Sequence, residues 1–176
     1  MNRNSSFLRN AVTSGGLASL FSAAVIAERG RTDGPSAAAP FNAVTHWLYG
    51  DRAYQVDAAT LQHTVLGFGI HMLSGVVWGL LFEAVLQRIG RSDNRGGKPA
   101  RAEGALPSGL FGAPTAGEVV ASAAVVTAMA ALTDLRLVPA RLSPGFEHRL
   151  RNDSIVLVYV CLAAGLALGA AARRRD

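Results

Sequence analysis

The feature that most constrains this chain is a set of four long apolar segments. They cover residues 11–27, 64–86, 115–138 and 154–172, and most of the charged residues lie between them or at their ends. As an α-helix, the second segment would rise about 34 Å, which is enough to cross a hydrocarbon core of about 30 Å. The pattern therefore predicts an all-α integral membrane bundle of four transmembrane helices, with residues 1–176 forming a single membrane domain.

The first of these segments has a second interpretation. Arg3 and Arg9 precede an apolar stretch that ends in the small-residue run SAAVIA, residues 22–27. This order of features is also typical of a secretory signal with its cleavage site. The rest of the chain is typical of a multi-span membrane protein, which favours a retained span, but the sequence leaves both alternatives open.

The basic residues predict how the chain is oriented, because Lys and Arg accumulate on the cytoplasmic side of a membrane. With a cytoplasmic N-terminus, ten of the 17 Lys and Arg residues lie inside and seven outside. Five of the ten belong to residues 87–114, which are rich in Gly, Pro, Arg and Ala and are predicted to form a flexible basic loop near anionic lipid headgroups. We expect a multi-pass membrane protein with the N-terminus and C-terminus in the cytoplasm.

A short polar and aromatic stretch, PFNAVTHWLYGD, occupies residues 40–51 of the first loop. Pro40 suits the first turn of a helix and Gly50 suits its end. Apolar residues recur between them at helical spacing, namely Phe41, Val44 and Leu48. This pattern predicts a short amphipathic interfacial helix, anchored at headgroup level by its aromatic residues. In the alternative, the helix is a lid over a polar site, with His46 and Asp51 facing His71 and Asp134.

Four ionisable residues lie within the predicted spans, where such residues are costly and suggest a function. His71 and Asp134 lie toward the outer ends of the second and third spans, and Glu83 and Glu118 lie near the inner ends. We expect Glu83 to reach the surface and meet Arg88 or the basic loop. Glu118 falls in the first helical turn, where the helix dipole favours a carboxylate. The outer two residues, His71 and Asp134, are predicted either to form a hydrogen bond or ion pair between their helices or to belong to a polar site.

Candidates for chemistry are few. His71, Asp134 and His46 are the candidate catalytic residues of an enzyme, and the same three are the candidates for a metal site, with His63 as an alternative to His46. No HExxH or other compact ligand motif occurs, so we predict no metal and no other cofactor. The single cysteine, Cys161, excludes an intramolecular disulfide and a zinc site built from thiolates.

Small residues predict close helix packing. Gly75 and Gly79 form a GxxxG motif in the second span, and Gly165 and Gly169 form another in the fourth. In lipid, such motifs let two helix backbones approach closely. They are expected to pack within the chain, although a homo-oligomer or a membrane protein partner would use the same chemistry.

These features favour a non-enzymatic integral membrane protein of unknown molecular function, either a small transport-related bundle or a membrane-organising subunit. The alternative is an intramembrane enzyme that acts on a lipid or envelope precursor through a His/Asp polar site. The expected partner is the lipid bilayer. Nucleic acid is not expected, because the net charge of +5 is not gathered on a basic helix face with interleaved aromatics.

Three pieces of the sequence carry a resemblance. They are NAVTHWLYGD (42–51), HTVLGFGIHMLSGVVWGLLFE (63–83) and DLRLVPARLSPGFEHRL (134–150). In these pieces the chain resembles a family of uncharacterised small multi-span bacterial inner-membrane proteins. The resemblance implies a multi-span membrane protein and carries no known activity, substrate or cofactor.

Overall fold

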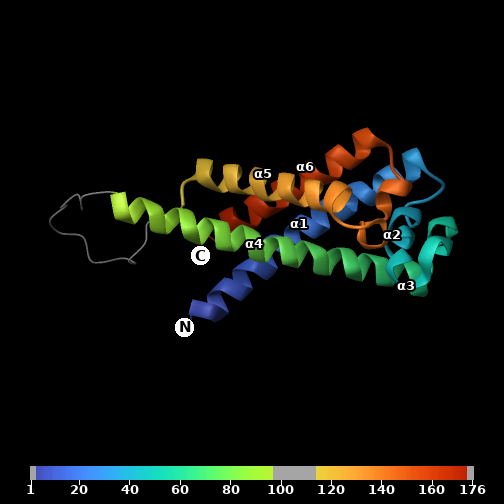
Figure 1. Cartoon of the computed structure of the whole chain (residues 1–176), viewed down its shortest axis with the longest axis horizontal. Helices are drawn as coiled ribbons and strands as arrows, with labels where there is room; N and C mark the ends of the chain where they lie inside the picture. Colours follow the sequence, from blue (N-terminus) through green and yellow to red (C-terminus); the bar gives the residue numbers. More distant parts are fainter. Residues whose placement is uncertain (1–2, 97–113, 174–176) are drawn as a thin grey trace.

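The computed structural model describes residues 3–96 and 114–173, and all the regular elements in these residues are helices (Figure 1). Four long helices form the bundle: α1 (Arg3–Asp33), α4 (Leu66–Gly96), α5 (Ala116–Leu132) and α6 (Asn152–Ala172). π-helical turns precede α4 and follow α5, at Leu61–Val65 and Thr133–Leu137. Each long helix coincides with a segment that is long and apolar enough to cross a membrane. The prediction of an all-α chain with four such helices is confirmed.

Two of the helices are longer than their apolar segments. α1 and α4 each have 31 residues. α4 continues to Gly96, through the first part of the loop predicted at 87–114, and residues 97–113 of that loop lie outside the described residues. The extension has a simple reason: Gln and Arg are good helix formers, so loss of apolar character after residue 86 does not end a helix.

α1 is the central helix of the bundle, because α4 and α6 both pack along it while α5 packs on α6 and α4. The contact between α1 and α4 uses glycines on both sides. A Cβ added at Gly79 would lie 2.8 Å from Cα of Gly15, and one added at Gly75 would lie 3.0 Å from the Gly15 carbonyl oxygen. A side chain at either position would force the two helices apart.

The contact between α1 and α6 is built in the same way. A Cβ added at Gly165 would lie 2.7 Å from the backbone nitrogen of Ala18, and one added at Gly169 would lie 2.5 Å from Cα of Ser14. The glycines of both GxxxG motifs therefore contact a single helix, α1, within the chain. Close approach of this kind is how small residues stabilise helix pairs in lipid.

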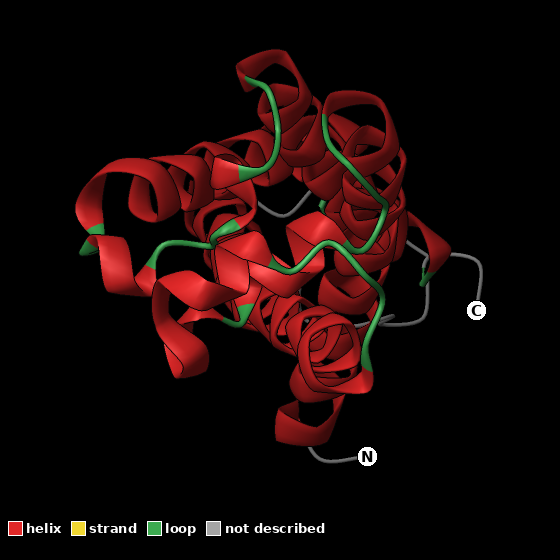
Figure 2. Ribbon diagram, turned by 90° about the vertical axis from the view of Figure 1, so that its right-hand side faces the viewer, coloured by secondary structure: helices red, strands yellow, loops and turns green. Residues whose placement is uncertain are grey.

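A layer of short helices and loops, which we call the cap, lies across one end of the bundle (Figure 2). The cap consists of residues 34–60 and 138–151. It contains α2 (Ala39–Val44), α3 (His46–Tyr49) and three 3-10 helices at Gly50–Gln55, Ala140–Leu142 and Phe146–His148. The first described residues of α1 and the last of α6 lie toward the opposite end of the bundle (Figure 1).

Hydrogen bonds hold the cap together. The amide nitrogen of the buried Asn42 donates to the carbonyl oxygens of Val56 and Ala58 at 2.8 and 3.0 Å, and its oxygen accepts from Thr64 at 2.6 Å. The indole nitrogen of Trp47 donates to the carbonyl oxygen of Ser143 at 2.7 Å, which joins the two parts of the cap. Asn42 in particular supplies hydrogen-bond donors to two carbonyl groups that lie outside any regular helix or sheet.

The short helix expected at residues 40–50 differs from the prediction. It is two helices, α2 and α3, that meet at Thr45, where the hydroxyl of Thr45 donates to the Asn42 carbonyl oxygen at 2.7 Å. Such local side-chain bonds compete with regular helix. All six residues of α2 are buried, whereas Leu48 is 64% exposed, so the expected apolar stripe does not lie on one surface. The two ends are as predicted: a proline in the first turn and Gly50 at the end, with φ 62°.

The polar residues at the opposite end also differ in part from expectation. Glu83 is buried, and its carboxylate pairs with Arg173 rather than with Arg88. The reason is the position of Glu83 on the face of α4 that packs against α1 and α6, which the sequence alone does not show. Glu118 behaves as predicted at a helix start, because it forms a capping box with Thr115 at the beginning of α5.

Candidate functional site

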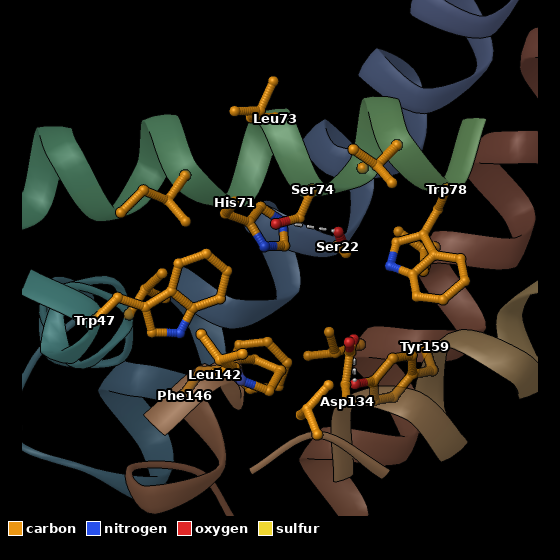
Figure 3. A pocket seen from close by; sticks show the side chains of 18 residues that line it. Ser22, Trp47, His71, Leu73, Ser74, Trp78, Asp134, Leu142, Phe146 and Tyr159 are labelled. Carbon is orange, nitrogen blue, oxygen red and sulfur yellow. Dashed lines mark hydrogen bonds between the residues drawn. The ribbon is translucent and has the colours of Figure 1, made fainter. Parts of the chain in front are cut away.

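A cavity of about 460 Å³ lies between α4, the end of α5 and α6, beneath the cap (Figure 3). Most of its wall is apolar, with side chains such as Ile70, Val158 and Leu162. Five hydroxyl, imidazole or carboxyl side chains interrupt this surface: Ser22, His71, Ser74, Asp134 and Tyr159. An apolar chamber with a few convergent polar groups is the usual form of a small-molecule site.

Helical spacing on α4 decides which side chains reach the cavity. His71, Ser74 and Trp78 follow one another at intervals of three and four residues, so they lie on one face. Figure 3 shows all three on the cavity side of α4, while Leu73 points away. Leu73 and Val77 still border the cavity, and they are 66% and 56% exposed. The wall of the cavity therefore reaches the surface of the bundle along this part of α4.

His71 is held against α1 by its Nε2 atom. This nitrogen lies 3.2 Å from the carbonyl oxygen of Ser19 and 3.0 Å from the hydroxyl oxygen of Ser22. Because a carbonyl oxygen only accepts, Nε2 carries a hydrogen and donates it. Both hydrogen bonds that His71 makes within the described residues use Nε2. In the neutral ring, Nδ1 is then an acceptor that these two bonds leave unused.

Asp134 lies in the π-helical turns that follow α5, and it is bonded to α6. The hydroxyl of Tyr159 donates to its Oδ2 atom at 3.1 Å. Figure 3 places this pair across the cavity from His71. The two residues singled out by sequence thus face one cavity, but within the described chain each is bonded to other partners and not to the other.

His46 lies elsewhere. Its ring nitrogens lie 2.9 and 3.2 Å from the carbonyl oxygens of Ala43 and Ala140, and its ring stacks on Tyr54 with 5.0 Å between centroids. With Asp51, it lines a separate hollow of about 810 Å³ on the cap. The arrangement in which His46 and Asp51 face His71 and Asp134 is therefore wrong, because the side chain of His46 is used to tie the two parts of the cap together.

The hollow on the cap has its own electrostatic character. Arg141 and His148 border it together with Tyr54. Burial raises the pKa of the Tyr54 hydroxyl, and the carboxylates of Glu147 and Asp51 raise it further, so this phenol stays protonated at neutral pH. The wall of this hollow is therefore more polar than the wall of the cavity between the long helices.

Metal ligands are not gathered in the described part of the chain. There, no three His, Cys, Asp or Glu side chains lie close enough together to hold an ion. Cys161, on α6, is partly buried and forms no disulfide. What the cavity between the helices offers is a small set of hydrogen-bonding groups in an apolar chamber.

Sequence reasoning misses several residues that line the cavity. Tyr159 lies in the most apolar segment, and a tyrosine hydroxyl inside a span needs a partner, which is a usable signal. Ser22 and Ser74 resemble the other small residues of their helices and carry no such signal. Trp47 is one of the aromatics expected at the membrane surface, but its ring borders the cavity.

No protein-family model, curated protein or solved structure matches the chain.

Proposed function

We propose that this chain is a non-enzymatic multi-pass membrane protein that holds a lipid-like molecule in the cavity between α4, the π-helical turns after α5, and α6. The supporting observation is the cavity itself: about 460 Å³, mostly apolar, and partly open, with exposed residues of α4 in its wall. This volume falls in the range of small-molecule sites, which is roughly 300–1,000 Å³. Holding such a molecule is compatible with either a transport-related or a membrane-organising role.

The position of the exposed wall favours a ligand that arrives from the bilayer. Leu73 and Val77, in this wall, belong to the part of α4 that is long and apolar enough to lie in a membrane. Six cap residues line the chamber at this end of the bundle: Val44, Trp47, Val138, Leu142, Pro144 and Phe146. A molecule that enters from the side passes only apolar side chains, whereas one that enters from water would have to displace the cap.

For the location, we propose the bacterial inner membrane, with both termini in the cytoplasm and the cap on the outer side. An even number of spans places both ends of the chain on one side. The excess of Lys and Arg on that side supports the cytoplasm. The lipid bilayer is then the main partner. A homo-oligomer or protein partner would use faces other than the GxxxG glycines, because α1 already covers them.

An intramembrane enzyme is the second candidate, and one observation favours it: His71 and Asp134 border the same cavity. In that case the two would act as acid and base on a bound lipid precursor. The two functions differ in the fate of the ligand. A binding protein returns it unchanged, whereas an enzyme converts added lipid extract into a product that His71→Ala or Asp134→Asn abolishes.

The first experiment is mass spectrometry of what the protein retains in mild detergent. We expect one lipid-like molecule per chain in the wild type and its loss in Ser74→Phe, because the larger side chain fills the cavity. Val156→Phe is the matched control: Val156 is on the exposed face of α6, outside the cavity, and its variant should retain the ligand. Equal, non-stoichiometric lipid in all three proteins contradicts the proposed function, and a stoichiometric metal lost in His71→Ala contradicts the assignment of no cofactor.

A further inference from the structure

We infer that the ligand of this cavity has a head group that carries hydrogen-bond donors and no negative charge, as in a long-chain alcohol or amine. Long-chain acids and lipid phosphates, whose head groups are negatively charged, should not bind in the cavity. The inference rests on the proposed function, because it specifies the chemistry of the same site. Three observations carry it: the free acceptor atom of Asp134, the tautomer of His71, and the charges on the wall.

Asp134 supplies the first acceptor. Tyr159 occupies its Oδ2 atom, and the bond fixes the orientation of the carboxyl group toward the cavity that both residues border. The described residues give its second oxygen, Oδ1, no hydrogen-bond donor. An oxygen of this kind in an apolar chamber is costly unless a donor reaches it, and a ligand hydroxyl or amine is such a donor.

His71 supplies the second acceptor. Its Nε2 atom is committed to Ser19 and Ser22 of α1, so the neutral ring presents Nδ1 as a lone-pair acceptor. Ser74 lies three residues after His71, on the same face of α4. It adds a hydroxyl that can both donate and accept a hydrogen bond. A head group that satisfies these side chains must bring hydrogens of its own.

The charges on the wall give the third argument. Among the described residues that line the cavity, none is Lys or Arg, and one, Asp134, is acidic. A carboxylate or phosphate head would therefore be buried beside a carboxyl group without a counter-charge, which is strongly unfavourable. Arg141 lines the separate hollow on the cap and not this cavity. The indole N–H of Trp78 provides one donor, which suits the oxygen of an alcohol.

The two tryptophans of the chain make a direct test available. Trp47 and Trp78 are the only tryptophans in the sequence, and both line the cavity. Bromine atoms quench tryptophan fluorescence on contact. Chain-brominated dodecanol, dodecylamine, dodecanoic acid and dodecyl phosphate are titrated into the full chain in phosphatidylcholine nanodiscs at mildly alkaline pH. Quenching is plotted against the mole fraction of each probe in the bilayer, so that differences in partitioning are removed.

We expect the alcohol or the amine, or both, to reach half-maximal quenching at a mole fraction at least about tenfold lower than either acidic probe. Asp134→Asn should reduce that difference several-fold, because an amide can donate to an acidic head and bears no charge. Glu28→Gln is the matched carboxyl-to-amide control: Glu28 is exposed at the end of α1 and pairs with Arg31, so its change should leave all four curves unaltered.

Two results overturn the inference in different ways. If an acidic probe quenches as well as the alcohol and the amine, the head-group assignment is wrong while the proposed cavity function stands. If none of the four probes quenches above the background set by brominated phosphatidylcholine, the proposed function fails with it. The comparison of head groups uses the wild-type protein, so it does not depend on the folding of any variant.

Discussion

Glu83 of α4 and Arg173 at the end of α6 form an ion pair of 2.6 Å inside the bundle, at the end opposite the cap. Ser14 of α1 joins them, because its hydroxyl donates to Glu83 at 3.0 Å and lies 2.6 Å from the Arg173 guanidinium. Arg173 also donates to the Asn10 carbonyl oxygen at 2.9 Å. Three helices that are distant in sequence are thus connected by one polar network.

Loss of the Glu83 charge should destabilise the bundle. Glu83→Gln leaves the Arg173 cation without its partner, and we expect a loss of roughly 2–4 kcal/mol in the free energy of unfolding. The side chains of Glu83 and Arg173 are 5% and 22% exposed, so solvent replaces little of the lost interaction. Unfolding by dodecyl sulfate in mixed micelles measures the change. The double variant Glu83→Met/Arg173→Met should lose less than the single one.

The control for this prediction is the ion pair between Glu28 and Arg31. Both side chains are about two-thirds exposed. Glu28→Gln should cost under about 1 kcal/mol, as exposed pairs do. If Glu83→Gln is no more destabilising than Glu28→Gln, the network of Glu83, Arg173 and Ser14 does not hold the three helices together.

Two glycines of α4 should respond differently to alanine. Gly79 contacts α1 closely, whereas a Cβ at Gly69 would meet nothing within 4 Å. We expect Gly79→Ala to cost about 1–3 kcal/mol through overpacking, and Gly69→Ala to be neutral or slightly stabilising. Both are measured by the same unfolding titration. A change in oligomer mass for Gly79→Ala, with the stability of the monomer unaltered, would instead point to a homodimer contact.

A second pair of glycines tests the cap. Gly145 and Gly50 both have positive φ, 87° and 62°, but only Gly145 is crowded: its added Cβ would lie 2.8 Å from Nδ1 of His46. Gly50→Ala should cost only the backbone strain of about 1–3 kcal/mol, because φ 62° with ψ −159° is a conformation that essentially only glycine adopts. Gly145→Ala should cost more and should speed amide hydrogen exchange over α2 and α3. Equal exchange rates in the two variants would show that the cap does not depend on this contact.

The proposed orientation is tested by labelling single cysteines in whole cells. In a Cys161→Ser background, Arg52→Cys marks the cap and Arg88→Cys marks the opposite end, and both positions are exposed. A membrane-impermeant maleimide should label Arg52→Cys in intact cells and Arg88→Cys only after the membrane is opened. The reverse pattern means that the cap faces the cytoplasm, and labelling of both in intact cells would contradict a membrane-spanning arrangement.

The sequence predicts the long helices well because length and hydropathy are local properties. It also places the helix start at Pro40 and the end at Gly50, because proline and glycine act on their own turn. The partners of Glu83 and His46 are not predictable in this way. They depend on which helix faces which: Glu83 meets Arg173, 90 residues away, and His46 meets the carbonyl oxygen of residue 140.

The cavity shows the same limit. His71 and Asp134 stand out in the sequence because ionisable residues are rare in apolar segments. Their bonding partners, Ser19, Ser22 and Tyr159, are ordinary helix residues whose role appears only when α1 and α6 are in place. The existence of a chamber at all depends on how far α4 diverges from α5 and α6, and hydropathy carries no information on that distance.

The central position of α1 has a consequence for biogenesis. Of the four long helices, α1 leaves the ribosome first, yet the helices that cover its two small-residue faces follow later, α6 last of all. During synthesis, the surface of α1 around Ser14 and Ala18 stays uncovered until α6 arrives. Among these four helices, the last docking step therefore joins the newest helix to the oldest.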